Sequence, residues 1–372
     1  MATDEVEESA ELQAFRKELR EWLAANNLGA VGAGFGTSDV AVAKAWQAAL
    51  YDAGYVDVGP EQAAVVSEEL GRLNVFLGTF MVGMSMTRPT IVTHGTDEQK
   101  ARFLPPLMRG DEIWCQLFSE PGAGSDLAGL ACRAERDGDE WVINGQKVWT
   151  SGAQNSDWGI LMARTDWDVP KHRGISYFLF PMHQDGVEIR PLRQMTGAAH
   201  FNEVFLTDAR VPDANILGGL NNGWAVGMTT LANERVAIGG GGGRGSVFDQ
   251  LLATARSHGR AGDPVVRQQL AAAYSRIELI RWLGQRGGLA TMTLKLSYAQ
   301  HNKALGELAL ALQGPAGALR NEWTDSFLSA PSIRIAGGSD EVQRNILGER
   351  VLGLPAEPRP DKTAPFRDLP RN

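Results

Sequence analysis

The sequence predicts an α+β protein in which a β-domain lies between two helical domains. Apolar side chains recur at helical spacing through residues 11–107, and short apolar runs separated by turn residues fill residues 114–206. Helical spacing returns after Val211-Pro212. This order predicts an N-terminal helical domain over 1–112, a middle β-barrel or sandwich domain over 113–217, a C-terminal helical domain over 218–353 and a tail over 354–372. The tail is rich in Pro and Arg, which indicates an extended arm or a disordered segment.

The helical regions contain several amphipathic segments. Thr96 and Gln99 have the spacing of an N-terminal capping box, which predicts a helix that runs into Leu107. A run of glycines at 239–243 is expected to end one helix of the C-terminal domain. The other expected helices are Glu11–Ala25, Val40–Gly54, Glu61–Leu73, Trp224–Ile238, Pro264–Arg286, Ala290–Leu312 and Gln343–Leu352.

The middle region reads as about seven short strands. Turn residues at Asp137-Gly138-Asp139 and at Asp185-Gly186 separate some of them, and Asn144-Gly145 between alternating residues predicts a tight hairpin. The expected strands are Trp114–Phe118, Glu140–Ile143, Lys147–Ser151, Trp158–Ala163, Ile175–Pro181, Val187–Leu192 and Phe201–Leu206.

Composition narrows the class of protein. The 372 residues are enough for several packed layers, and the formal net charge of −8 argues against nucleic acid or an anionic membrane as partner. No apolar run spans a bilayer, and the acidic start lacks a secretory apolar segment, so we expect a cytoplasmic protein. Cys115 and Cys132 form no metal-binding motif, which predicts free thiols and no metal site.

The stretch from Cys115 to Ser151 carries the strongest functional signal. It combines the glycine-rich turn Glu120-Pro-Gly-Ala-Gly-Ser-Asp126 with Trp149-Thr150-Ser151 at the end of a strand. Small residues and hydroxyls let a backbone approach a flat polar ligand, and an indole can cover the face of that ligand. These features predict a large aromatic cofactor, a flavin, held on a β-sheet.

Five separate motifs resemble the acyl-CoA dehydrogenases, in that family's order and over most of the chain from Glu61 to Pro355. They are FSEPGAGSDLAG at 118–129, DGDEWVINGQKVWTSGA at 137–153, RGISYFLFP at 173–181, QMTGAAHFNEVFLTDARVP at 194–212 and GGSDEVQRNILGERVLGLP at 337–355. The resemblance implies a C-terminal four-helix bundle, FAD between this bundle and the β-domain, and oxidation of an acyl-CoA thioester to a trans-2-enoyl-CoA. It also implies electron transfer to an electron-transfer flavoprotein and a homo- or hetero-oligomeric state, a dimer or a tetramer.

The same resemblance assigns roles to single residues. Phe118 and Ser119 would contact the isoalloxazine ring, and Gly124 and Ser125 the pyrophosphate or the CoA pantetheine. Trp149 would cover the ring, with Thr150 and Ser151 near its reactive edge. The remaining implied contacts are Ser339 and Glu341 with FAD, Gly338 with FAD or substrate, and Arg235 and Gly337 with substrate.

The catalytic base is expected at Glu234. Many family members carry a Glu at the position of Gly337, which cannot accept a proton. A minority carry the base just before an Arg on the first long helix of the C-terminal domain, where this chain has Glu234-Arg235. Burial would raise the pKa of such a carboxylate toward the working pH. The alternative is that Glu234 only forms a structural ion pair with an Arg.

Three departures from the family pattern leave other functions open. The stretch YDAGYVDVGPEQAA at 51–64 is shortened, ARSHGRAGDPVVRQQLA at 255–271 matches only weakly through Arg256 and Gln268, and LALQGPAG at 310–317 replaces a Gln-x-x-Gly-Gly motif. They resemble a divergent, actinobacterial-type subset, some of which pair unlike subunits and oxidise bulky acyl-CoAs such as sterol side chains. A non-catalytic subunit of a heteromer and an acyl-CoA oxidase-like enzyme are the two alternatives.

Overall fold

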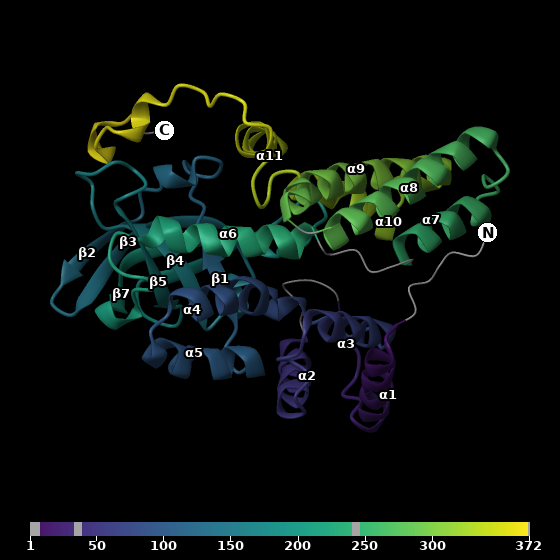
Figure 1. The fold of residues 1–372 in the computed structure, drawn as a ribbon, viewed down its shortest axis with the longest axis horizontal. Helices are drawn as coiled ribbons and strands as arrows, with labels where there is room; N and C mark the ends of the chain where they lie inside the picture. The colour runs from purple at the N-terminus through teal and green to yellow at the C-terminus, as the bar shows by residue number, and fades with distance from the viewer. Residues whose placement is uncertain (1–7, 33–38, 240–245, 287, 371–372) are drawn as a thin grey trace.

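The computed structural model describes residues 8–32, 39–239, 246–286 and 288–370, and it shows a β-domain between helical regions (Figure 1). The N-terminal region is helical in its described elements, apart from an isolated bridge between Val31 and Val75. Its elements are α1 (Ala10–Ala25), α2 (Val40–Asp52), α3 (Pro60–Arg72), the 3₁₀ turn η1 (Gly78–Phe80), the π-helix η2 (Val82–Thr87), α4 (Arg88–His94) and α5 (Asp97–Arg109).

The capping box before α5 is confirmed. The Gln99 backbone N–H donates to the Thr96 hydroxyl at 3.2 Å, and the Thr96 N–H donates to the Gln99 side-chain oxygen at 3.1 Å. The segment from η1 to α4 was missing from the expected helices. It packs against α5, α6 and β1 and is buried on several sides, so no amphipathic stripe marks it in the sequence.

Seven strands form one curled, mixed sheet. They are β1 (Trp114–Leu117), β2 (Arg133–Asp137), β3 (Glu140–Ser151), β4 (Trp158–Arg164), β5 (Ile175–Pro181), β6 (Val187–Leu192) and β7 (Phe201–Pro212). Their order is β1-β4-β2-β3-β7-β6, and β5 pairs with β4. Strands β1 and β2 run parallel to β4, whereas the other pairs are antiparallel.

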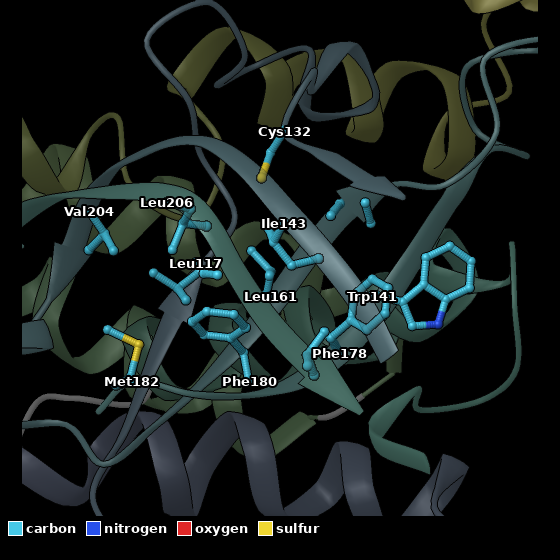
Figure 2. Packing of buried hydrophobic residues seen from close by; sticks show 14 of the residues in the cluster. Leu117, Cys132, Trp141, Ile143, Leu161, Phe178, Phe180, Met182, Val204 and Leu206 are labelled. Atoms are coloured by element: carbon cyan, nitrogen blue, oxygen red, sulfur yellow. The ribbon is translucent and has the colours of Figure 1, made fainter. Parts of the chain in front are cut away.

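Each face of the sheet has its own core. One face encloses an apolar cluster around Leu161, Phe178 and Phe180, and Figure 2 shows these side chains packed between strands. The other face packs Trp114 and Tyr177 against helices α4, α5 and α6. Because both faces are buried, strands such as β4 and β5 read as continuous apolar runs.

The hairpin expected at Asn144-Gly145 is wrong. Both residues lie inside β3, which is one long strand, and the hairpin is formed by Asp137-Gly138-Asp139 between β2 and β3. Strand β2 was not expected at all. Gly145 is required for another reason: a Cβ there would lie 2.9 Å from the Cα of Cys132, the residue just before the neighbouring strand β2. The dipeptide therefore marks a close backbone approach and a register shift against β7.

The C-terminal region consists of α6 (Gly223–Gly239), the bundle helices and α11 (Asp340–Ile346), which continues into the π-helical turn η8 (Leu347–Val351). The four bundle helices are α7 (Ser246–Ser257), α8 (Pro264–Arg286), α9 (Leu294–Gln313) and α10 (Glu322–Ile333), and they share an apolar core that includes Leu251, Leu270 and Leu305. Helices α7 and α10 were not expected. The glycines at 240–243, expected to end α6, lie outside the described residues.

The tail is an extended arm, and it is ordered against the β-domain. After α11 it crosses toward the strands (yellow in Figure 1), with the short turns η9 (Pro360–Lys362) and η10 (Phe366–Asp368). Phe366 is buried. Within the described ranges no helix is long and apolar enough to cross a membrane.

Candidate active site

Helix α6 carries Glu234 into the interior of the molecule. The helix contacts β5, η2, α4 and α9. One turn before Glu234, the Thr230 hydroxyl lies 3.0 Å from both the Tyr177 and the Thr90 hydroxyls, which fixes the rotation of α6 against the sheet and α4. The Glu234 side chain is only 9 % exposed. A carboxylate in such a position is unusual unless it has a partner or a chemical role.

The partner of Glu234 is Gln116 on β1. The Gln116 side-chain amide donates to Oε2 of Glu234 at 3.2 Å. Among the described residues, no Lys, Arg or His nitrogen lies within 4.0 Å of the Glu234 carboxylate. Glu234 therefore has a hydrogen-bond partner but no direct ion pair, which argues against a purely structural pair with Arg235.

Burial raises the pKa of Glu234 above its ordinary value. The hydrogen bond from Gln116 and the positive charges of Arg235 and Lys295 act in the opposite direction. A buried carboxylate whose pKa is moved toward neutrality is suited to general-base chemistry. Arg235 is half-buried, and burial lowers the pKa of its guanidinium.

Lys295 on α9 lies close enough to Glu234 to affect its pKa, and it holds the segment that contains Gly337 and Gly338. Its ammonium donates to the carbonyl oxygen of Gly338 at 2.6 Å, and the Gln343 side-chain amide donates to the carbonyl of Gly337 at 2.8 Å. Both glycines have positive φ angles, 63° and 91°. The backbone at these positions thus favours glycine for conformational reasons, besides the space that the missing side chain leaves.

The glycine-rich turn Glu120–Asp126 is anchored at its start by Lys147, which sequence reasoning missed. The Lys147 ammonium is fully buried and donates to Glu120 Oε1 at 2.8 Å, to the Phe118 carbonyl at 3.0 Å and to the Met162 carbonyl at 2.8 Å. The Glu120 carboxylate also accepts the backbone N–H groups of residues 131 and 132. Lys147 therefore ties β3 to the turn, and a lone Lys in a strand gives no local signal of this.

The predicted flavin residues of the turn differ in accessibility. The Phe118 side chain is buried in the core beside Tyr177, and its carbonyl oxygen accepts from Lys147, so little of this residue is open to a ligand. Ser119 is half-buried, and its carbonyl accepts the N–H of Val148. Gly124 and Ser125 are exposed, and a Cβ on Gly124 would meet no atom within 4 Å. The tip of the turn is thus open to a ligand.

The end of β3 presents an aromatic surface beside unused hydrogen-bonding groups. Trp149 is 60 % exposed, has a left-handed φ of 62° and meets Phe201 edge-on at 6.0 Å. Thr150 is fully buried with a hydroxyl that has no hydrogen-bond partner, and Ser151 is half-buried. An exposed indole next to an unsatisfied hydroxyl is the kind of surface that a flat polar ring completes, so these residues fit a flavin.

The predicted contacts on α11 are less well suited to an anion. Ser339 caps the helix by accepting the N–H of Val342. Glu341 is exposed beside Arg344, and Asp340 is buried in an ion pair with Arg334. Two acidic residues in the first turn repel a phosphate, so a contact of this segment with FAD would run through Ser339 and the backbone.

The structure groups the predicted residues into two neighbouring sets. Glu234 and Gly338 lie near Lys295, with Arg235 and Gly337 as their chain neighbours, whereas Ser119, Ser125 and Trp149 lie along the turn and the end of β3. Strand β1 links the sets, because Gln116 contacts Glu234 only three residues before Ser119. A buried carboxylate beside a surface that fits a flavin is the arrangement of a flavin-dependent oxidoreductase.

Comparison with known proteins identifies the family. Residues 51–111, 115–209 and 221–352 match the acyl-CoA dehydrogenase N-terminal, middle and C-terminal domains. The chain therefore belongs to the acyl-CoA dehydrogenase family, whose members are FAD-dependent oxidoreductases.

Similar proteins include two acyl-CoA dehydrogenases of Mycobacterium tuberculosis. FadE34 is 41 % identical over 80 % of this chain, an alignment that spans only 43 % of FadE34. IpdE1 is 38 % identical over 93 % of this chain and 99 % of IpdE1. Among solved structures, the Tcur3481-Tcur3483 steroid acyl-CoA dehydrogenase has a TM-score of 0.80 at 28 % identity, covering 95 % of this chain and 100 % of that one. The ChsE4-ChsE5 complex of M. tuberculosis gives a TM-score of 0.77 at 26 % identity, with the same coverage.

Proposed function

We propose that this chain oxidises an acyl-CoA thioester to the trans-2-enoyl-CoA with Glu234 as the base that removes the α proton. The observation that carries the proposal is the burial of Glu234 on α6, with a neutral hydrogen-bond donor and no direct cationic partner within the described ranges. A family that acts on acyl-CoA needs such a base, and Gly337 cannot supply it.

The residues divide the work between proton removal and ligand positioning. The Glu234 carboxylate accepts the α proton, and its surroundings exclude the water that would otherwise compete for it. Gln116 orients the carboxylate, and its hydrogen bond and the positive charges of Arg235 and Lys295 offset part of the rise in the Glu234 pKa that burial causes. Ser119, the Gly124-Ser125 tip, Trp149 and Ser151 would hold FAD, which when bound would supply the acceptor for the β hydride. An electron-transfer flavoprotein would then reoxidise the cofactor.

The substrate that we propose is a bulky acyl-CoA, of the steroid-derived kind. The similar solved structure that carries a steroid acyl-CoA dehydrogenase title supports this class. Gly337 supports it too, because it adjoins Gly338, whose carbonyl accepts from Lys295, a residue near Glu234, and the missing side chain adds room in that segment.

We further propose that the chain works in an oligomer with a like or unlike subunit. Both similar structures are named as pairs of proteins. Helix α8 also leaves large apolar side chains exposed, which include Tyr274, Leu279 and Trp282, and Ile335 is exposed just after α10. Such exposure is typical of a protein–protein interface. Light scattering of the chain alone should show a dimer or larger species; a monomer that remains monomeric at high concentration would contradict self-association.

The test of the activity is anaerobic mixing of the FAD-loaded protein with acyl-CoA thioesters of straight, branched and steroid side chains. Loss of the oxidised flavin absorbance, fastest with a steroid-type thioester, supports the proposal. In Glu234→Gln the cofactor should stay bound while the bleaching rate falls by several orders of magnitude. Fast reoxidation by oxygen would favour the oxidase alternative, and failure to bind FAD would favour a non-catalytic subunit.

A further inference from the structure

The C-terminal arm, residues 354–370, is fastened to the connection between β4 and β5. The Phe366 N–H donates to the Val169 carbonyl at 2.9 Å, and the Arg367 N–H donates to the Trp167 carbonyl at 3.0 Å. Pro365 also forms an isolated bridge with Pro170. In Figure 1 the arm leaves α11 and ends over the β-domain. Main-chain hydrogen bonds of this kind fix the arm in one register on the connection.

Phe366 covers a buried cation that holds the residues just after the glycine-rich turn. The Phe366 ring is 4 % exposed and lies 3.4 Å from the Arg164 guanidinium carbon. Arg164 is fully buried and donates to the carbonyls of Ala128, Leu130 and Lys171, at 2.7, 3.0 and 3.0 Å. Phe366 of the arm therefore shields from solvent the Arg164 guanidinium, which holds the chain after Asp126 through its hydrogen bonds.

A second cation joins the arm to the turn itself. The Lys171 ammonium lies 2.9 Å from both carboxylate oxygens of Asp126 and 2.5 Å from a carboxylate oxygen of Asp361 in the arm. The Lys171 side chain is 10 % exposed, whereas the Asp126 side chain is 62 % exposed. Asp126 directly follows Ser125, so a residue of the arm and the tip of the turn share one partly buried ion.

The turn needs anchors at both ends because of its composition. Lys147 and Glu120 hold its start, and the open tip contains Gly122 and Gly124, which restrict the backbone little. Glu120 and the buried Ala123 also pair through two backbone hydrogen bonds, so it is the position of Gly124 and Ser125 beyond them that depends on what holds Asp126 and the residues after it. Lys171 and Arg164 make those contacts, and the arm contacts Lys171 through Asp361 and Arg164 through Phe366.

We propose that the C-terminal arm positions the glycine-rich turn for a nucleotide diphosphate, with Asp361 and Phe366 as positioning residues. This rests on the proposed function, in which the turn contacts a ligand during acyl-CoA oxidation. FAD and CoA both carry a diphosphate, and either would lose affinity if the tip of the turn moved. Among the described residues, no hydrogen bond or ion pair joins the arm to Glu234, Arg235, Gly337 or Gly338, so we expect the chemical step itself to be unaffected by the arm.

The test compares Asp361→Asn and Phe366→Ala with the matched control Arg367→Gln. Arg367 belongs to the same arm, but it forms an ion pair with Asp168 in which both side chains are exposed to solvent. Three constants are measured: the FAD dissociation constant of the apoprotein, and KM and kcat for the acyl-CoA that the wild type oxidises fastest. We expect Asp361→Asn to raise the FAD dissociation constant or KM by about fivefold, with kcat within about twofold. The control should change none of the three.

The variant Asp126→Asn shows whether Asp361 affects ligand affinity through Asp126 or only stabilises the fold. If Asp361 acts through Lys171 on Asp126, then Asp361→Asn has little further effect on ligand affinity in the Asp126→Asn background. A rise in the FAD dissociation constant of Asp361→Asn would indicate that the turn binds the diphosphate of FAD. A rise in KM would indicate that it binds the diphosphate of CoA. Unchanged FAD affinity and KM in both Asp361→Asn and Phe366→Ala would overturn the proposal.

Failure of the arm proposal can be told from failure of the proposed function. FAD affinity is measured without turnover, and it therefore tests the arm even if Glu234→Gln retains full activity. If instead Phe366→Ala does not fold, Asp361→Asn, which replaces a carboxylate that is 33 % exposed by an amide of the same size, still decides the outcome.

Discussion

Replacing Lys147 by methionine should detach the start of the glycine-rich turn from β3. The ammonium is fully buried and makes three hydrogen bonds, one of them to the Glu120 carboxylate. Removing one partner of a buried ion pair costs about 3–5 kcal/mol, because the remaining charge is left without compensation. Glu120 would keep two backbone N–H donors, so we expect a loss near the lower end, about 3 kcal/mol.

The assay is equilibrium denaturation of Lys147→Met, Glu120→Gln and the double variant, together with the FAD content of each purified protein. The double variant should be more stable than the sum of the single losses predicts, by about 1–3 kcal/mol, because neither charge is then left alone. FAD content should fall in Lys147→Met, since the turn is displaced. A loss below about 1 kcal/mol with strictly additive variants would refute this account of Lys147.

Four further predictions follow from single contacts. Gln116→Leu removes the donor to Glu234 and should raise the pKa of Glu234 further, so the acidic limb of the kcat/KM profile moves to higher pH; an unmoved limb would contradict this. Because the folded-state pKa of Glu234 is raised, its contribution to stability is fully present below the ordinary Glu pKa and is lost as pH rises through the folded-state value. Denaturation across that range should therefore show a falling stability in the wild type relative to Glu234→Gln, and parallel curves would count against a buried carboxylate. Gly145→Ala places a Cβ 2.9 Å from Cys132 Cα and should cost about 1–3 kcal/mol in a thermal melt, whereas no change would mean that the strands can separate freely. Thr96→Ala removes the cap of α5 and should cost about 1 kcal/mol in the same assay.

Local patterns predicted the elements whose signals are local. The Thr96 capping box, the apolar run at Ile175–Pro181 and the long helix at Pro264–Arg286 all agree with the structure. Asn144-Gly145 misled because the same dipeptide that forms a tight turn also allows close contact between strands. Here the partner, Cys132, directly precedes β2, a strand that was not expected.

The candidate site was predictable only where a motif carried it. Glu234 stood out as a charge on an apolar helix, and the turn stood out by its glycines. Gln116 and Lys147 did not stand out in the sequence, because their partners, Glu234 and Glu120, come close to them only in the folded sheet. The Gln116 contact spans 118 positions, and no spacing rule reaches that far. The ordered arm was equally hidden, since its single buried aromatic, Phe366, stands in a stretch rich in Pro and Arg.

The most direct test of Glu234 as the base separates proton removal from hydride transfer. A 3-thia-acyl-CoA has sulfur at the β position and therefore no β hydrogen to transfer, but its α protons remain acidic. In D₂O, the FAD-loaded wild type should exchange the α protons of this thioester for deuterium, as followed by mass spectrometry. Glu234→Gln, with the same FAD content, should leave them unexchanged. Exchange by Glu234→Gln at a rate near that of the wild type would show that another group removes the proton.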